Sequence, residues 1–385
     1  MTKKSDAPAI RFKGFSDAWE QRKFSDITFP AGEKNKDNLP LESYSITNEH
    51  GFVPQDEKFE NGGTMREADK RMYYIVSPNS FAYNPARINV GSIGYQNVGE
   101  NVIVSSLYEV FKTSEDVDDR LLWHWFKSPD FQKLIMQLQE GGVRLYFYYD
   151  KLCMGEVSLP SLEEQRKIGK LFDTLDNLIT LHQRKCALLF SSFQALISMM
   201  FTTSTFSWEQ RKLGDVATFI NGRAYSQPEL LSSGKYKVLR VGNFYTNDSW
   251  YYSDLELGEK YYADYGDLLY TWSATFGPHI WLGDRVIYHY HIWKIDLSNQ
   301  LEKQFAVQLL EQDKANILSS KNGSTMVHIT KEGMEQKDVI IPPSTKEQQE
   351  IGAFFQQLDN LITLHQRELE KLQNIKKSML EKMFV

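Results

Sequence analysis

The chain has 385 residues, a length that accommodates two or three globular domains of ordinary size. Hydrophobic residues make up 41% of it, which excludes wholesale disorder, and a formal net charge of −6 argues against a highly basic protein that coats nucleic acid. Cys153 and Cys186 form no zinc-binding spacing, and we find neither an N-terminal signal segment nor a long apolar run, so we expect a cytoplasmic protein with reduced thiols.

Residues 1–159 predict a first α+β domain, with a lead-in at 1–23. Short apolar runs at 88–95 and 102–111 are bounded by Gly, Asn and Asp, which is typical of strands. The stretch 119–140 has a helical pattern, and a polar loop with two glycines follows it. We therefore expect a small mixed or antiparallel sheet accompanied by a helical stretch.

Residues 160–206 predict a long helix. Pro160 and Ser161, followed by acidic residues, form a typical helix start. Seam positions then alternate in steps of four and three, as in a coiled coil. They are Ile168, Phe172, Leu175, Ile179, His182, Cys186, Leu189, Phe193, Leu196 and Met200. Further apolar residues such as Leu171 and Leu178 widen this seam, so part of the helix should also face a domain or a partner.

Residues 207–342 predict a second α+β domain. Its strand-like runs lie at 237–241, 268–272, 286–295 and 339–341, and a helical stretch covers 301–320. His289 and His291 alternate within the third run, where a strand would place both on one face. Because no third ligand accompanies them, we interpret them as strand residues and not as a metal site.

Residues 343–385 predict a second long helix with the same seam spacing. Its seam positions are Ile351, Phe355, Leu358, Ile362, His365 and Leu369. We expect the two helices to form an antiparallel coiled coil that relates the domains by a pseudo-two-fold axis. His182 and His365 occupy the same seam position, where polar residues that set the register are favoured over a metal or pH-sensitive site.

A duplication organises the whole chain. Trp19 to Lys23 reads WEQRK, as does Trp208 to Lys212, and LDNLITLHQR occurs both at 175–184 and at 358–367. The period of about 185 residues is far longer than the roughly 20–50 residues of solenoid repeats. Between these shared pieces, residues 24–159 and 213–342 differ almost throughout. The shared pieces therefore predict a scaffold, and the divergent pieces predict the variable function.

Polar and basic loop residues of both domains are candidates for contact with DNA. Arg pairs bidentately with guanine, Asn or Gln with adenine, and glycine permits close approach to a phosphate backbone. The candidates are Arg66, Arg87, Gln96, Asn97, Arg144 and Tyr146 in the first domain, and Asn221, Arg223, Arg240, Asn243, Lys321, Asn322 and Ser324 in the second. The loops at 141–146 and 321–325 are also compatible with simple solvated turns.

No set of catalytic residues is recognisable in the sequence. Asn84 to Arg87 reads NPAR, an incomplete form of an amino-methyltransferase motif that no glycine-rich cofactor loop accompanies. Glu335 and Lys337 lack a clear acidic partner for a nuclease site. We therefore predict no catalytic residue, no metal site and no cofactor bound by this chain.

This organisation resembles the specificity (S) subunit of type I restriction–modification enzymes. The resemblance rests on the opening from Arg11-Phe12 to WEQRK, on its repeat at Trp208, and on the LDNLITLHQR segments with their Glu-Gln lead-ins. The segment from 327–330 to Ile341-Pro342-Pro343 also looks like the end of such a domain. Together these features cover nearly the whole chain.

The resemblance implies a mechanism. Each domain would read one half of a bipartite, non-palindromic DNA target, and the helices would set the gap and dock two adenine-methyltransferase (modification) subunits. S-adenosylmethionine, ATP and Mg²⁺ would be used by partner subunits, including motor–nuclease restriction subunits, and no membrane is involved. Two alternatives remain at this point: a structural adaptor that binds proteins without reading DNA, and a stand-alone methyltransferase or nuclease.

Overall fold

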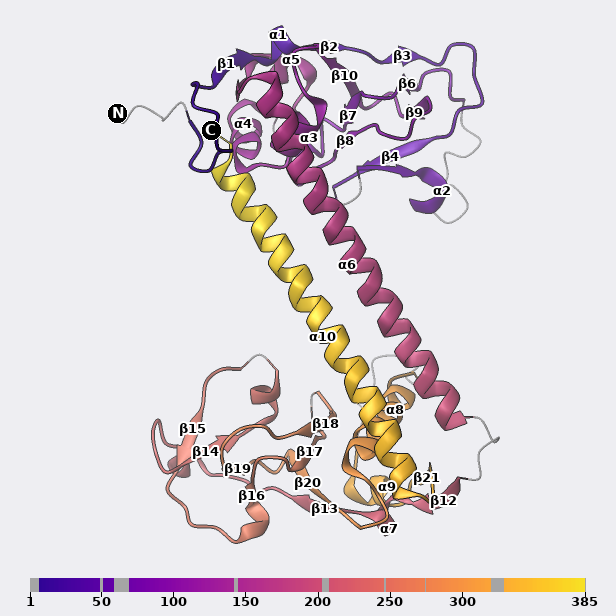
Figure 1. Ribbon diagram of the computed structural model, residues 1–385, viewed down its shortest axis with the longest axis vertical. Helices are drawn as coiled ribbons and strands as arrows, with labels where there is room; N and C mark the ends of the chain where they lie inside the picture. The colour runs from indigo at the N-terminus through magenta and orange to yellow at the C-terminus, as the bar shows by residue number, and fades with distance from the viewer. Residues whose placement is uncertain are drawn as a thin grey trace. The chain divides into compact units, whose positions relative to one another are not determined.

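The computed structural model describes residues 7–48, 51–58, 69–141, 145–202, 208–245, 247–273, 275–319 and 329–384. The chain forms two compact units, one made of Met1–Gln183 with Arg367–Val385 and the other of Arg184–Gln366 (Figure 1). Each unit therefore consists of one globular part and segments of both long helices. Among the described residues, no helix has the length and hydropathy needed to cross a bilayer.

The globular part of the first unit is α+β, as predicted. β1 (Glu20–Lys23) pairs antiparallel with β11 (Glu156–Leu159). A four-stranded sheet has the order β2 (Thr28–Pro30), β10 (Glu109–Thr113), β7 (Phe81–Tyr83), β8 (Ile93–Tyr95). A three-stranded sheet has the order β3 (Glu33–Lys34), β6 (Tyr74–Val76), β9 (Val102–Val104). β4 (Tyr44–Thr47) and β5 (Gly51–Pro54) pair with each other. The short helices are α1 (Phe24–Ile27), α2 (Gln55–Lys58), α3 (Asp119–Trp125), α4 (Pro129–Leu138), α5 (Tyr149–Met154) and the 3-10 turn η2 (Ile88–Val90).

An aromatic core stabilises the first globular part. Phe24, Phe81, Phe111 and Phe126 are fully buried, and their ring centroids lie 5.1–6.0 Å apart. Burial of each such ring contributes about 1.5–3 kcal/mol to stability. The short strands therefore depend on tertiary packing and not on their own length.

Three sequence predictions need correction in this unit. The stretch 119–140 is two helices, because Ser128 caps a new helix that begins at Pro129. The run 102–111 is not one strand but β9 and β10, joined by a turn. The first residues of the run 88–95 form η2, and only Ile93–Tyr95 is a strand.

The globular part of the second unit repeats two sheets of the first, the pair beside the long helix and a four-stranded antiparallel sheet, but its remaining strands form one four-stranded sheet where the first unit has a three-stranded and a two-stranded one. β12 (Glu209–Lys212) pairs antiparallel with β21 (Asp338–Ile341), so each WEQRK repeat forms the strand that pairs beside the start of a long helix. The sheets are β13 (Ala217–Asn221), β20 (Ile292–Leu297), β17 (Leu268–Thr271), β18 (Gly277–Ile280); and β15 (Tyr251–Ser253), β14 (Tyr236–Leu239), β19 (Val286–Tyr288), β16 (Tyr262–Ala263). The helices are α7 (Leu213–Val216), α8 (Lys303–Ser319), α9 (Lys331–Glu335) and the 3-10 turns η3 (Gln227–Glu229), η4 (Val241–Phe244) and η5 (Glu259–Tyr261).

The two predicted long helices are α6 (Leu162–Thr202) and α10 (Thr345–Lys382). In the first unit they run antiparallel: the rings of Phe172 and Phe384 stack at 5.8 Å, and farther along His182 Nδ1 lies 3.5 Å from Glu368 (Figure 1). In the second unit Phe193 meets Phe355 edge-on at 5.4 Å.

The burial of side chains along both helices follows the predicted spacing. Buried positions are Ile168, Phe172, Leu175, Phe355 and Ile362; half-buried ones are Ile179, His182, Cys186, Leu189, Ile351, Leu358, His365 and Leu369. The residues between them are mostly exposed. This pattern agrees with a four-three seam over these residues. Farther along α6 the prediction is wrong at Leu196, which is 38% exposed, because the neighbouring Ile197 is the buried position there.

Charged side chains join α6 to α3 and to the C-terminal part of α10 in the first unit. Nε2 of the buried His124 lies 3.0 Å from Asp173, and Lys376 forms a close ion pair with Asp176. Burial lowers the pKa of His124, and it lowers the pKa of Lys127, 3.9 Å from Asp176, to about 8. Polar contacts within a helix pair favour one register over the others.

A buried glutamine fastens each long helix to its own globular part. Gln165 in the first turn of α6 donates to the carbonyl of Pro160 at 2.9 Å and accepts from the N–H of Asp118 at 2.8 Å. Gln348 in α10 makes the corresponding bonds in the second unit. The Gln of the repeated lead-in therefore bonds both the proline just before the helix and the backbone of the globular part.

A glycine one turn later brings the helix backbone close to the globular part. A Cβ on Gly169 would lie 2.9 Å from the Cβ of Arg120 in α3. A Cβ on Gly352 would lie 2.7 Å from the Cβ of Gln304 in α8. Both units therefore use the same close contact between a long helix and a shorter one.

The acidic neighbour of each glutamine differs between the units. Glu164, which is fully buried, accepts two 2.7 Å bonds from Nε and Nη2 of Arg11. Glu347 instead accepts from the indole Nε1 of Trp208 at 3.0 Å. The same Glu-Gln lead-in thus takes two different partners.

The hydrogen bonds of Gln348 predict that Gln348→Ala strongly lowers the free energy of unfolding. The backbone groups of Gln300, Glu302 and Pro342 would lose a buried partner, so the free energy of unfolding should fall by about 2–4 kcal/mol in urea denaturation followed by circular dichroism. Gln349→Ala, at the exposed neighbouring position, is the matched control and should change it by less than about 0.5 kcal/mol. Equal losses would contradict a fastening role.

Candidate nucleic-acid interface

The second globular part brings together residues that are far apart in the sequence. β14 and β19 pair in parallel, so both strands end at the same edge of the sheet. Arg240 follows β14 and His289 follows β19, and the N–H of His289 donates to the carbonyl of Leu239 at 2.9 Å. The predicted Arg240 therefore lies beside His289 at this edge.

The loop after β13 packs against the same edge. The N–H of Arg223 donates to Tyr288, and its carbonyl accepts from Tyr290, both at 3.1 Å. Gly222 permits this approach, because a Cβ there would lie 2.4 Å from the carbonyl oxygen of His289. The side chain of Asn221, at the end of β13, is exposed. Together these loops form what we call the arginine edge: Asn221, Arg223, Arg240 and residues 289–291.

The side chain of Arg223 is held from two directions. Its Nη2 donates to Glu229 at 2.6 Å, and its guanidinium lies over the ring of Tyr225, 5.1 Å from the centroid. The other oxygen of Glu229 accepts from the N–H and the hydroxyl of Ser226, both at 2.8 Å. The hydrogen bond from Arg223 lowers the pKa of Glu229 to about 2, so this carboxylate stays ionised.

Arg240 has a different environment. Its guanidinium lies over Tyr251, 4.3 Å from the centroid, and its Nη2 donates to the carbonyl of Ser249 at 3.3 Å. The oxygen of the Asn243 amide accepts from the N–H of Arg240, and its nitrogen donates to the carbonyls of Asn247 and Ser249. The predicted Asn243 is thus occupied by its own loop, whereas Arg240 has no carboxylate partner among the described residues.

The run 286–295 is not the single strand that the sequence predicted. β19 ends at Tyr288, β20 begins at Ile292, and residues 289–291 form the turn between them. Trp272 fixes this turn, since its Nε1 donates to the carbonyl of Tyr290 at 3.0 Å and its ring lies 5.1 Å from that of His291. The turn thereby presents Tyr290, which is 39% exposed.

Two histidines of the second globular part, His289 and His279, are uncharged at neutral pH. Burial lowers the pKa of His289 to about 4, and the nearby His291 and Arg240 add to the effect. Burial likewise lowers the pKa of His279 to about 4; its ring stacks on Phe244 at 4.2 Å. Burial also lowers the pKa of His291. Positive charge at the arginine edge therefore comes from its arginines and not from imidazoles.

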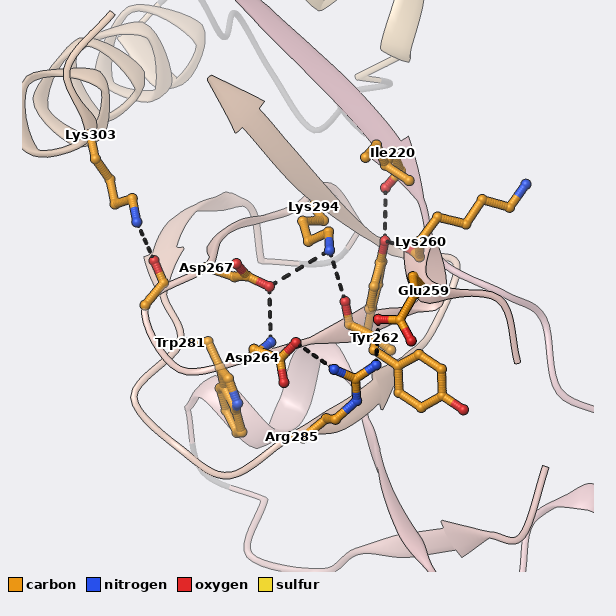
Figure 2. A network of polar contacts seen from close by, with 12 residues as sticks. Ile220, Glu259, Lys260, Tyr262, Asp264, Asp267, Trp281, Arg285, Lys294 and Lys303 are labelled. Atoms are coloured by element: carbon orange, nitrogen blue, oxygen red, sulfur yellow. Dashed lines mark hydrogen bonds and ion pairs between the residues drawn. The ribbon is translucent and has the colours of Figure 1, made fainter. Parts of the chain in front are cut away.

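A network of polar contacts fixes the strands next to this edge, as Figure 2 shows. Arg285 donates to Glu259 at 2.6 Å and to Asp264 at 2.8 Å. Lys294 donates to the carbonyl of Tyr262 at 3.0 Å. These bonds hold β16 and the turn after it against β19 and β20.

The residue before His289 extends this network. The hydroxyl of Tyr288 donates to the carbonyl of Lys260 at 2.6 Å, and it lies 3.5 Å from the carbonyl of Ile220 at the end of β13. The two strand ends that carry the arginine edge are therefore tied to one framework.

Arg87 and Tyr146, both predicted from the sequence, lie close together in the first unit. Arg87 is exposed in the turn after β7, and the N–H of Phe147 donates to the carbonyl of Pro85 in the same turn at 3.0 Å. This bond places Tyr146 beside the turn. The ring of Tyr146 stacks on Tyr148 at 5.6 Å and 2°, which forms a flat aromatic surface near Arg87.

Gln96 and Asn97 lie at the other end of the same hairpin, away from Arg87. The Gln96 side chain is fully buried; it donates to the carbonyl of Glu100 at 2.6 Å and accepts from the N–H of Val98 at 2.7 Å. This placement argues against a base-reading role for Gln96 and for a structural one. Asn97 is exposed.

Five predicted residues lie outside the described ranges of the chain: Arg66, Arg144, Lys321, Asn322 and Ser324. Sequence reasoning also missed side chains that the structure places at the arginine edge. Tyr225 and Glu229 follow Arg223 at a short distance, which was a usable signal. Trp272 and Tyr251 had no such signal, because only tertiary pairing brings them to the edge.

Comparison with known proteins identifies the family. The family model described as type I restriction modification DNA specificity domain matches residues 33–189 and again residues 207–374. The chain therefore belongs to the family of type I restriction–modification specificity subunits. The two matches agree with the duplication seen in the sequence.

Individual relatives support the same assignment. The chain is 23% identical over 340 residues to the type I restriction enzyme MjaVIII specificity subunit of Methanocaldococcus jannaschii, covering 80% of this chain and 78% of that protein. The fold is similar to the crystal structure of a type I S subunit from M. genitalium, with a TM-score of 0.63, 14% identity and coverage of 98% and 99%. A chain from a study of assembly and conformational transition of the type I R-M system has a TM-score of 0.55, 14% identity and coverage of 94% and 96%.

The close approach at Gly222 predicts a steric effect of Gly222→Ala. The new methyl group would press on the carbonyl of His289 and displace the loop, so the free energy of unfolding should fall by about 1–3 kcal/mol. Gly258→Ala is the control, because nothing lies within 4 Å of a Cβ there. Urea denaturation followed by tryptophan fluorescence measures both variants, and a neutral Gly222→Ala would show that the loop is not packed as described.

The lowered pKa of His279 predicts a dependence of stability on acid. Between pH 6.5 and about 4 the unfolded chain binds a proton at His279 that the folded chain does not, so the free energy of unfolding should fall as the pH falls through this range. His279→Gln removes this contribution and should lose less stability over the same range. Identical slopes for both proteins would contradict a neutral, buried imidazole.

Proposed function

We propose that this chain is the DNA sequence-specificity subunit of a type I restriction–modification complex, in which each globular part reads one half of a bipartite target. One observation carries the proposal: two units that share two sheets and the same helix fastening present different side chains on their loops. The second presents the arginine edge, and the first presents Arg87 and Tyr146. Two different readers on one scaffold imply a non-palindromic target.

The domain boundaries proposed here are residues 1–159 and 207–342 for the readers, with 160–206 and 343–385 as helices that set the gap. The chain itself carries no catalytic residue in this proposal. Modification subunits would methylate adenine with S-adenosylmethionine, motor–nuclease subunits would use ATP and Mg²⁺, and the complex would act in the cytoplasm.

Exposed apolar side chains on the long helices support the docking of modification subunits. Leu178 and Leu181 on α6 are 38% and 48% exposed, and the corresponding Leu361 and Leu364 on α10 are 39% and 52% exposed. Apolar surface left exposed at the same positions of a repeated segment is typical of a binding site for a partner. Because the two segments are identical in sequence, two copies of one partner would fit them.

The proposal predicts the outcome of a domain exchange. The chain is co-expressed with its modification subunit, and methylated adenines are mapped across the genome by single-molecule sequencing. Replacement of residues 213–342 by those of a relative should change one half of a bipartite motif and leave the other half and the gap as they were.

Other outcomes would count against it. If no motif appears, or if both halves change together, the two-reader arrangement is wrong. A protein-binding adaptor would in addition show no DNA binding that weakens steeply as salt rises, which is the behaviour that phosphate contacts produce.

A further inference from the structure

We propose that Arg223 reads a guanine in the half-site of the second globular part, and that Glu229 is the residue that positions it. The inference rests on the proposed function, because it takes the second globular part to be a DNA reader. It adds the chemical class of base and the pair of residues responsible.

Arg223 is held rigidly by its backbone and by its side chain. Its backbone is bonded on both sides to Tyr288 and Tyr290, which belong to the framework of β19 and the following turn. Its guanidinium is oriented by Glu229 and by the face of Tyr225, and that ring in turn stacks on His289 at 6.4 Å. An arginine held in this way loses little conformational entropy when it binds, which favours contact with a planar target.

The charge of Arg223 is neutralised by Glu229. Glu229 lies 2.6 Å from the Arg223 guanidinium and is itself fixed by Ser226, so the pair carries no net charge. An arginine that served only to attract phosphate would be weakened by such a partner. The ion pair leaves the remaining N–H donors of Arg223 in place, and contact with a base edge depends on such donors and not on net charge. The ion pair therefore favours a base contact over a phosphate contact.

The hydrogen-bond donors of Arg223 match the acceptors of guanine. Nη2 of Arg223 has a hydrogen-bond acceptor in the described structure, while Nη1 is covered and has none there. A covered donor without an acceptor costs free energy, but an incoming acceptor reaches Nη1 only after the atoms over it shift, and Nε of Arg240 is covered and unpaired in the same way. The distinction between the two arginines therefore rests on the carboxylate partner of Arg223. The side chain is 31% exposed and thus accessible to a ligand. Guanine presents two adjacent acceptors, N7 and O6, which match the arginine fork.

Arg240 supplies an internal comparison. It lies at the same edge and also covers a tyrosine ring, but it has no carboxylate partner among the described residues. Its charge is therefore available to attract phosphate. The two arginines should consequently differ in kind: loss of Arg223 should relax one base position, and loss of Arg240 should weaken all sites alike.

The test uses the full chain co-expressed with its modification subunit and the same genome-wide map of methylated adenines. The variants are Arg223→Lys, which keeps the charge but not the fork, Glu229→Gln, and Arg240→Ala as the matched control. The half of the motif that belongs to the second globular part is taken from the domain exchange, and the other half is the internal standard for folding and assembly.

In the unmodified chain this half should contain a guanine. Arg223→Lys should reduce discrimination at that one position by roughly 5- to 150-fold, the value of a bidentate contact, and leave the other positions unchanged. Glu229→Gln should relax the same position to a smaller extent, an effect that a purely structural carboxylate would not produce. Arg240→Ala should lower methylation at every site without changing the motif.

Three results would overturn the inference while the proposed function stands. One is a second half-site without guanine on either strand. Another is full discrimination at every position in Arg223→Lys. The third is an Arg223→Lys chain that loses methylation at all sites equally, as a phosphate contact would. Failure of the proposed function itself is distinct, because then the unmodified chain yields no bipartite motif.

Discussion

The arrangement of each unit depends on one buried amide. Gln165 and Gln348 each bond the proline before a long helix and the backbone of the globular part, and a glycine one turn later allows that helix to touch a shorter one closely. A buried polar side chain that satisfies backbone groups has few alternative positions, because each lost bond is costly. The direction of each helix on its globular part is therefore set locally, by residues that both repeats share.

This fastening explains which residues are free to differ. The shared residues WEQRK, the Glu-Gln lead-in and LDNLITLHQR form β1 or β12 and the start and middle of a long helix. The loops that carry Arg223, Arg240 and Arg87 are built on other strands of the two globular parts. A change in the loops consequently alters what a unit presents without disturbing how it joins the helices, which is the property that the proposed function requires of an exchangeable reader.

The elements of the fold that were predictable from sequence are those that depend on local periodicity. Both long helices follow from a four-three pattern of apolar residues, which also gives the spacing of their buried positions except near the end of α6, where Ile197 is buried in place of Leu196. The turn at 289–291 was not predictable, because Tyr-His-Tyr-His has strand propensity and lacks Gly or Pro; the bond from His289 to Leu239 and the Trp272 contact create it. The environment of Gln96 was hidden for a similar reason, since only the tertiary fold shows that its amide is buried.

The candidate site was predictable in its residue types but not in its assembly. Arg223 and Arg240 become neighbours because β14 and β19 pair in parallel, a fact that no spacing reveals. Their partners matter as much as the arginines. A chain with a net charge of −6, in which His289 is uncharged and one arginine of the arginine edge is neutralised by Glu229, is poorly suited to bind DNA by bulk attraction. Under the proposed function such a surface would separate specificity from affinity, and phosphate attraction would then come from residues such as Arg240 and from the proposed partner subunits.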